Sequence, residues 1–545
     1  MPQTVLSLTL ELHPASVGRV RDLLDAWRTG EEQGREMYAD LRMQVPGLHF
    51  MSITVFSDIH YDPLLVIESS IDSRPELFWQ QLAAGYGDVL QSLIRCCKRP
   101  AGRTGALFDA AIAPGASAAI PGFLHRAAAR PIVAHQGHRG LDRSRIEQQA
   151  TLFDDTQLLL ACRAPKEIAT PAGLHAELRA ALLPGHPWLS QPAPARISFR
   201  ESLSDRLSLA LAFVLLLFGL SLPGLLLTAL NTVVALTVIA CVGLGAALTL
   251  RHGAGEAPAK GTADDAKHAS AEFALMLKHA APWLATTGHL VAASALFVAA
   301  YAAAGSAIVA LVHMGFGGEL FRAACIDGIR AMMLALASLG ATVPLLLLWL
   351  RHVERDPAQD EPLISSEGLA SMERAEDQIA QNHMASLVLI KPGVLRAVLL
   401  RAGLRGLGLL LRVLATDGYL GSMRTIHFAQ WSIVGNGSRL LFFSNFDGSW
   451  ESYLDDFIEK AHGGLSLAWG SCVGFPPCRF LVLGGASHGR QFKAWARRSM
   501  APASFWFSAY PADTVNQVER RTACANGLRQ TTLTEQEAAA WIRTL

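Results

Sequence analysis

The chain has 545 residues, of which 51% are hydrophobic and 17% charged, and its formal net charge is +1. This length exceeds what one hydrophobic core supports, so we expect several folding units. The near-zero charge and the lack of a basic patch argue against nucleic-acid binding. The eight cysteines have neither disulfide-scaffold nor zinc-site spacing, and no basic, apolar leader opens the chain. We therefore expect a reducing compartment, no metal site and no cleavable signal peptide.

The first predicted module covers residues 1–160. Polar and apolar residues alternate in its strands, and apolar residues recur at helical spacing in its helices. The expected elements are strands at 4–12, 48–56, 64–71 and 92–97 and helices at 15–30 and 75–92, followed by a strand near 131–134 and a helix at 142–155. The order βαββαβ of the first six is that of the ferredoxin-like split unit.

A membrane region is predicted at residues 207–350, between a connector at 161–206 and an acidic linker at 351–383. No charged residue interrupts the run from Leu207 to Leu250, which is long enough for two spans. Four transmembrane helices are expected, at 207–226, 230–250, 284–313 and 331–350, although the first two could form a kinked or re-entrant pair. An even number of spans places the N- and C-terminal modules on the same side of the membrane, and the basic residues that flank the spans concentrate on that side. The positive-inside rule then predicts a multi-pass inner-membrane protein with its N- and C-terminal modules in the cytoplasm.

The second predicted module covers residues 384–530 and is followed by a C-terminal helix within 531–545. Its expected strands are 384–390, 425–434, 439–446, 465–472 and 505–510, and its expected helices are 394–414, 449–461, 489–500 and 513–526. The stretch from Ser444 to Glu451 echoes the stretch from Ser69 to Glu76, and the same register pairs Asp72 with Asp447 and Cys97 with Cys472. The sequence therefore predicts an internal duplication, with two ferredoxin-like repeats that pair into an α/β barrel.

This arrangement resembles the dimeric α/β-barrel superfamily, and in particular the dye-decolourising peroxidases and chlorite dismutase-like proteins. The resemblance rests on the element order and on Ser444-Asn-Phe-Asp-Gly448, which is similar to the Gly-x-x-Asp-Gly motif of those peroxidases with Ser in place of the first Gly. It covers the two modules and not the membrane region. The resemblance implies a heme cofactor with Asp447 as the distal acid and a proximal histidine downstream, where only His462 and His488 follow.

Asp72 and Asp447 are the candidate catalytic residues, because a carboxylate beside a bound peroxide can move its proton. The alternative is that both cap the helices that follow them. His49 and His427 occupy equivalent places in Leu48-His-Phe50 and Ile426-His-Phe428, so they are candidates to line one cavity as ligand-binding or acid/base groups. A strand histidine satisfied by its neighbours is the alternative.

Aromatic residues gather in the second module and include Phe428 and Trp431. They either form a core or enclose an apolar ligand, and the two are the candidate ligand contacts. The predicted helix 394–414 places Arg401, Arg405 and Arg412 within roughly 40° of one another on a helical wheel. With Arg396 they are the candidate membrane contacts, where arginines meet anionic lipid; a stripe in water is the alternative.

Three functions follow as hypotheses. The first is a membrane-anchored cytosolic barrel that binds or processes a small apolar or lipid-derived molecule. The second is a heme-dependent, peroxidase-like oxidoreductase. The third is a non-catalytic docking platform for a partner enzyme. The expected partners are the lipid bilayer and a small apolar ligand, and the sequence does not identify a partner protein.

Overall fold

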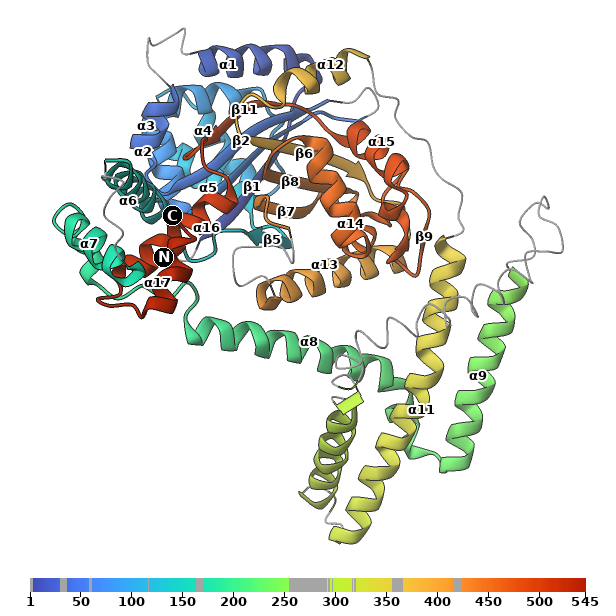
Figure 1. The fold of residues 1–545 in the computed structure, drawn as a ribbon. Coiled ribbons are helices and arrows are strands. Elements are labelled where there is room, and N and C mark those ends of the chain that lie inside the picture. The colour runs from blue at the N-terminus through green and yellow to red at the C-terminus, as the bar shows by residue number, and fades with distance from the viewer. Residues whose placement is uncertain are drawn as a thin grey trace. The chain divides into compact units, whose positions relative to one another are not determined.

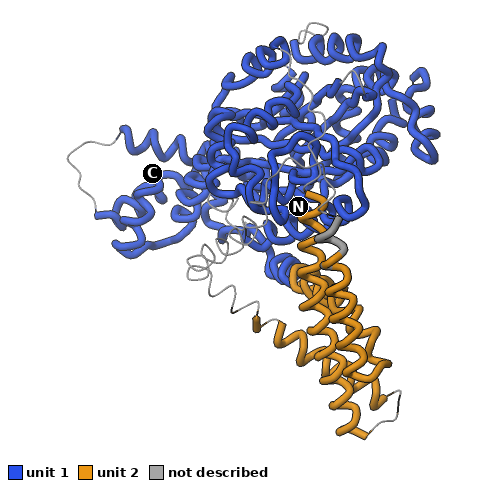
Figure 2. Tube along the Cα trace, turned by 90° about the vertical axis from the view of Figure 1, so that its right-hand side faces the viewer, with its two compact units in different colours: residues 1–206, 358–545 blue, residues 207–357 orange. Residues whose placement is uncertain are grey.

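The structure is a computed structural model that describes residues 3–29, 37–57, 61–115, 117–162, 170–253, 292, 295–296, 298–315, 317, 320–354, 366–414 and 423–545. The chain divides into two compact units, with residues 1–206 and 358–545 in the first and 207–357 in the second (Figure 2). The first unit is mixed α+β with antiparallel sheets, and the second is helical.

The N-terminal part of the first unit contains strands and helices close to those expected. Its elements are β1 (Thr4–Glu11), α1 (Val17–Thr29), α2 (Met37–Gln44), β2 (Leu48–Phe56), β3 (Leu64–Ile71), α3 (Pro75–Arg95), α4 (Arg103–Ile112), α5 (Ile120–Ala127), β4 (Ala128–Ala129), β5 (Val133–Gln136), α6 (Arg143–Ala161) and α7 (Pro171–Leu182). Apolar side chains of β1 to β3 pack on α1 and α3, with Leu24, Phe78 and Trp79 fully covered. The amphipathic pattern of these helices therefore forms the first core.

The C-terminal part of the first unit also combines strands with helices. It contains α12 (Ser366–Ala375), β6 (Gln381–Leu389), α13 (Val394–Leu414), β7 (Ile426–Val434), β8 (Arg439–Asp447), α14 (Trp450–Trp469), β9 (Cys478–Arg479), β10 (Leu483–Gly484), α15 (Gly489–Ser499), β11 (Ala503–Ser508), α16 (Val515–Arg529) and α17 (Glu535–Ile542). Figure 1 shows α13, α14 and α15 beside β6, β7 and β8. Aromatic side chains fill the space between these helices and strands.

The two halves of this unit exchange strands. Among the described residues, one sheet has the order β11-β2-β3-β1-β4 and another has the order β5-β7-β8-β6. Strand β11, from the C-terminal half, pairs antiparallel with β2, and β5, from the N-terminal half, pairs antiparallel with β7. Each half thus covers an edge of the other half's sheet, where an exposed edge would invite aggregation.

Two predicted strands are wrong. Residues 92–95 are the end of α3, and 465–469 are the end of α14. Leu90, Leu93 and Ile94 follow helical spacing, and a short apolar run does not distinguish a helix from a strand. Cys97 and Cys472, which the alignment of the two stretches places at matching positions, each form an isolated antiparallel β-bridge. Cys97 pairs with Leu12, and Cys472 pairs with Ile390. In the N-terminal half, a two-residue strand, β4, pairs with β1 instead.

Among the residues that the structure describes, three helices are long and apolar enough to cross a membrane: Phe199–Ala229, Val298–Gly315 and Phe321–Glu354. They include α8 (Phe199–Leu226) and α11 (Phe321–Glu354), and the apolar helix α9 (Thr232–Gly253) lies between them in sequence. The predicted span 284–313 falls partly outside the described residues. Close backbone packing occurs at Gly224, where an added Cβ would lie 2.1 Å from the carbonyl oxygen of Leu334. Small residues at helix contacts are typical of membrane bundles.

Candidate functional site

His49 and His427 both lie at β-bulges, at the start of β2 and β7. The register of β2 on β3 shifts between Leu48 and Phe50, and that of β7 on β8 shifts between Ile426 and Phe428, so each histidine is the extra residue. A bulge redirects a side chain out of the regular alternation of the strand. Both imidazoles are completely buried. The bulges therefore aim the two predicted histidines into the same interior region.

Asp72 and Asp447 each join a histidine to the N-terminus of a helix. Asp447 Oδ1 lies 2.7 Å from His427 Nε2, and its Oδ2 accepts the backbone N–H of Val515 at 2.7 Å. Asp72 Oδ2 lies 2.8 Å from His49 Nε2 and accepts the backbone N–H of Arg143 at 2.7 Å. The first turns of α16 and α6 favour a negative charge at these positions. The alternative that each aspartate caps the helix after it is wrong, because α14 is capped by Ser449 and α3 has Arg74 at its N-cap; the aspartates instead bind the first N–H of α6 and of α16.

A third side chain completes each cluster. Tyr510 Oη lies 2.9 Å from His49 Nδ1, and His138 Nε2 lies 2.9 Å from His427 Nδ1. His427 Nε2 is within hydrogen-bond geometry of Asp447, whereas His49 Nε2 faces Asp72 Oδ2 without the geometry of a hydrogen bond. We name the sets Tyr510–His49–Asp72 and His138–His427–Asp447 the two relays.

Burial sets the protonation of Tyr510 and His138, which are the outer members of the two relays. It lowers the pKa of His138 to about 4, against a partial opposing effect of Glu519. It also raises the pKa of Tyr510 well above its usual value, and the charge of Asp72 acts in the same direction. Burial opposes ionisation of Glu519, but His138 and Arg196 outweigh it, so the pKa of Glu519 lies below its ordinary value. At neutral pH the relays therefore hold neutral outer groups beside an ionised Glu519.

The relays also tie the exchanged strands to their hosts. The carbonyl of His49 accepts the N–H of Ala509, which follows β11, and the carbonyl of His427 accepts the N–H of Gly137, which follows β5. Tyr510 and His138 stand next to these two residues in sequence. Each relay therefore holds the chain that leaves an exchanged strand against the strand it pairs with.

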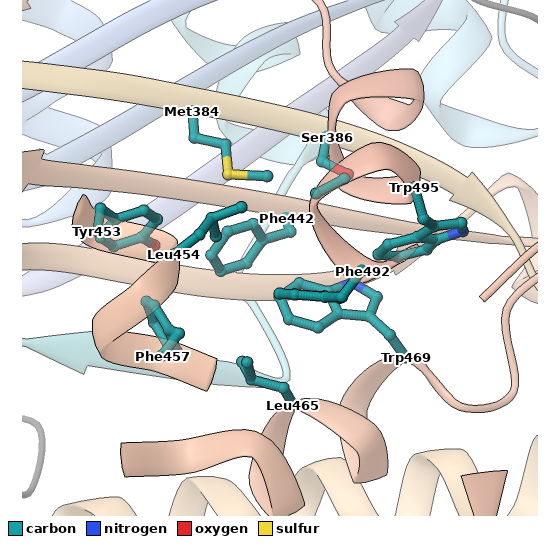
Figure 3. A pocket seen from close by; sticks show the side chains of 11 residues that line it. Met384, Ser386, Phe442, Tyr453, Leu454, Phe457, Leu465, Trp469, Phe492 and Trp495 are labelled. Atoms are coloured by element: carbon teal, nitrogen blue, oxygen red, sulfur yellow. The ribbon is translucent and has the colours of Figure 1, made fainter. Parts of the chain in front are cut away.

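The predicted ligand contacts Phe428 and Trp431 separate in the structure. Phe428 joins the relays, with its ring centroid 5.6 Å from that of His49. Trp431 instead packs with tilted rings against Phe442 and Trp469 in the second core. A cavity in that core is lined by aromatic side chains (Figure 3), but the space inside that water-sized molecules reach is only about 10 Å³. It holds about one water at most, which favours the core interpretation of the aromatic cluster.

A second polar network lies between the two sheets, and the sequence reasoning missed it. Glu68 on β3 is 1% exposed and contacts Ser52 of β2 at 3.4 Å and Asn445 of β8. Asn445 Oδ1 also accepts the indole N–H of Trp506 at 2.9 Å and lies 3.1 Å from His383 Nδ1. Burial raises the pKa of Glu68 to about 8 and lowers that of His383 to about 4. An acidic residue inside the apolar strand 64–71 was the signal that could have revealed it.

A cleft of about 1470 Å³ opens where β2, β6 and the loop before β11 end. Its apolar wall includes Phe56, Leu387 and Met500. Five arginines and three acidic residues also line it: Arg21, Arg28, Arg374, Arg439, Arg498, Asp25, Asp62 and Glu367. Sequence reasoning missed this cleft, because its residues come from segments far apart in the chain.

The four candidate membrane arginines of α13 differ in exposure. Arg405 and Arg412 are exposed and Arg401 is half-buried. Arg396 is only 7% exposed and its guanidinium reaches the carbonyl of Pro392 at 3.4 Å. The predicted stripe therefore has three members that reach the surface. The two downstream histidines also lie at the surface, and His462 Nδ1 lies 3.2 Å from a carbonyl of its own helix, that of Ile458.

Comparison of the chain with models of protein families, with curated proteins and with solved structures gives no match.

Proposed function

We propose that this protein is a membrane-anchored binding protein whose ligand is a small anionic amphiphile held in the cleft at the ends of β2 and β6. The observation that carries the proposal is the composition of that cleft: an apolar wall beside five arginines and three acidic residues. Its volume exceeds the roughly 300–1,000 Å³ of common ligand pockets, so a molecule with an extended chain fits. The proposal specifies the predicted lipid-derived ligand as one with a negative headgroup.

The chemistry of the wall supports a two-part ligand. Phe56, Leu387 and neighbouring apolar residues contact one another across the two sheets and would cover an alkyl chain. Arg439 lies over the ring of Tyr61 at 5.3 Å, and Arg28 lies 3.4 Å from Asp25, so both guanidinium groups are held near the cleft. Guanidinium groups bind carboxylates and phosphates through paired hydrogen bonds.

A binding titration tests this proposal. Decyl phosphate and uncharged decanol are titrated separately into the full chain in nanodiscs, with heat or intrinsic fluorescence as the readout. We expect decyl phosphate to bind and Arg439→Gln to weaken it about tenfold, since a hydrogen bond to a charged group contributes roughly 1.5–3 kcal/mol. The matched control is Arg103→Gln, on α4 and outside the cleft lining, which should leave affinity unchanged.

Two outcomes would count against the proposal. Equal affinity for decyl phosphate and decanol would show that the arginines do not bind the negative headgroup. Failure of both compounds to bind, with the variants unchanged in melting temperature, would favour the docking platform instead.

We also propose that the two halves of the first unit are ferredoxin-like repeats paired in one chain as an α/β barrel. The order β2-β3-β1-β4 is compatible with the split βαββαβ unit, and β7-β8-β6 repeats three of its strands. The matching bulges, the matching aspartates and the reciprocal strand exchange support a duplication. The basic flanks of the membrane region support a multi-pass inner-membrane protein with both modules in the cytoplasm.

The peroxidase-like activity and its heme cofactor stay a prediction that the geometry does not favour. A distal acid needs a carboxylate oxygen directed at the bound peroxide. Both oxygens of Asp447 already have partners, in His427 and Val515. Asp72 contacts His49 and Arg143 through Oδ2 alone, and its Oδ1 is buried beside them. The two aspartates are better explained as members of the relays.

A further inference from the structure

Helix α13 carries an exposed apolar stripe beside its arginines. Along the helix the exposed fractions are 82% for Val394, 57% for Val398, 40% for Leu410 and 68% for Leu414, and Ala402 is also exposed. These positions recur at intervals of four or a multiple of four, so they follow one continuous strip that turns slowly around the helix. The opposite face, with Leu400 and Leu404, is buried in the second core.

The arginines border this stripe. At roughly 100° per residue, Arg401, Arg405 and Arg412 lie within about 40° of one another at one edge of the exposed arc. Val394 shares that edge, and the other exposed apolar residues continue around the arc. Between residues 394 and 414 the sequence contains no Asp or Glu. An apolar face bordered by cations is the composition of a helix that lies in the headgroup region of an anionic bilayer.

A partly buried arginine, Arg139, links the end of α13 to the start of the first candidate membrane helix. Arg139 Nη1 donates to the carbonyl of Arg412 at 2.9 Å, and its Nη2 lies 2.5 Å from Glu201 and 2.6 Å from Asp205. Glu201 and Asp205 belong to the first two turns of α8, which continues as a candidate span. The C-terminal end of α13 is therefore held beside the point from which the chain continues into α8.

We propose that α13 lies in the bilayer interface, with Val394, Val398, Leu410 and Leu414 among the acyl chains and Arg401, Arg405 and Arg412 on anionic lipid headgroups. This surface is separate from the cleft, and the inference does not depend on the ligand proposed above. If α13 lies in the interface, one particular face of the first unit contacts the bilayer. A domain held only by a flexible linker would have no such preferred face.

Photo-crosslinking tests the inference. The full chain carries p-benzoylphenylalanine at Val398 and, in a second variant, at Leu410. It is reconstituted in nanodiscs of phosphatidylcholine with or without phosphatidylglycerol, irradiated, and scored for lipid adducts by intact mass. The matched control places the same group at Met43 of α2, which is 71% exposed. We expect several-fold more lipid adduct at Val398 and Leu410 than at Met43, and more with phosphatidylglycerol than without it.

A charge reversal separates the two parts of the inference. Arg405→Glu with Arg412→Glu should remove the phosphatidylglycerol dependence, and both residues are exposed, so the melting temperature should not change. Adduct yields at Val398 equal to those at Met43 would overturn the inference. Adducts that do not depend on phosphatidylglycerol in the parent chain would overturn the role of the arginines.

Discussion

Replacing Asp447 with alanine is expected to lower the free energy of unfolding by about 2–6 kcal/mol, because two buried hydrogen-bond donors are left unpaired at a cost of roughly 1–3 kcal/mol each. Asp447 is 8% exposed and accepts hydrogen from His427 Nε2 and from the backbone of Val515. Without it, a buried imidazole and the first N–H of α16 both lose their acceptor. The loss also frees the segment between β11 and α16, which the relays hold in place.

Chemical unfolding of the detergent-solubilised chain, followed by tryptophan fluorescence, measures this loss. The control is Asp455→Ala on α14, whose side chain is 64% exposed and pairs with Lys493 at the surface. Exposed pairs contribute about 0–1 kcal/mol, so this variant should stay close to the parent. An unchanged midpoint for Asp447→Ala would contradict the structural role of the relays and return Asp447 to the list of candidate catalytic acids.

Replacing Glu68 with glutamine is expected to stabilise the protein by several kcal/mol at pH 8 but very little at pH 4.5. Burial raises the pKa of Glu68 from its ordinary value of 4.5 to about 8. Between these values the unfolded chain releases a proton that the folded chain keeps, so stability falls as pH rises, by about 1.4 kcal/mol per pH unit. Glutamine keeps the polar contacts and removes this proton linkage.

The difference between the parent and Glu68→Gln at each pH isolates this group, because the buried histidines contribute equally to both. His138 and His383, whose pKa values burial lowers to about 4, make both proteins lose stability as pH falls below 6.5. Glu459→Gln, at an exposed position of α14, is the matched control and should show no such trend. A constant difference between pH 5 and pH 8 would mean that Glu68 is ionised inside the protein.

Local patterns predicted much of this fold. The strands predicted at 48–56 and 64–71 match β2 and β3, and Asp72 and Asp447, which the two similar stretches align, each accept the first N–H of a helix. The histidine pair was visible as well, because His49 and His427 have the same neighbours in sequence. Short-range periodicity and repetition are sufficient for such features.

Long-range pairing was not predictable in the same way. Nothing in the residues of β5 and β11 indicates that each pairs with the other half, since a strand's partner depends on the whole topology. Tyr510 and His138 therefore had no signal as relay members, although they lie in equivalent places before α16 and α6. The cleft also had no signal in the sequence, because its wall combines residues from α1, α12 and the ends of several strands.

The most direct test of the proposed function is to identify what the protein retains from its own membrane. The full chain and Leu387→Trp, which places an indole in the cleft, are extracted in a polymer belt, and the small molecules that each retains are quantified by mass spectrometry. The proposal predicts one class of anionic amphiphile that is bound to the parent and depleted from Leu387→Trp, while bulk phospholipids stay equal in both. Identical compounds in identical amounts, with both proteins folded, would contradict it.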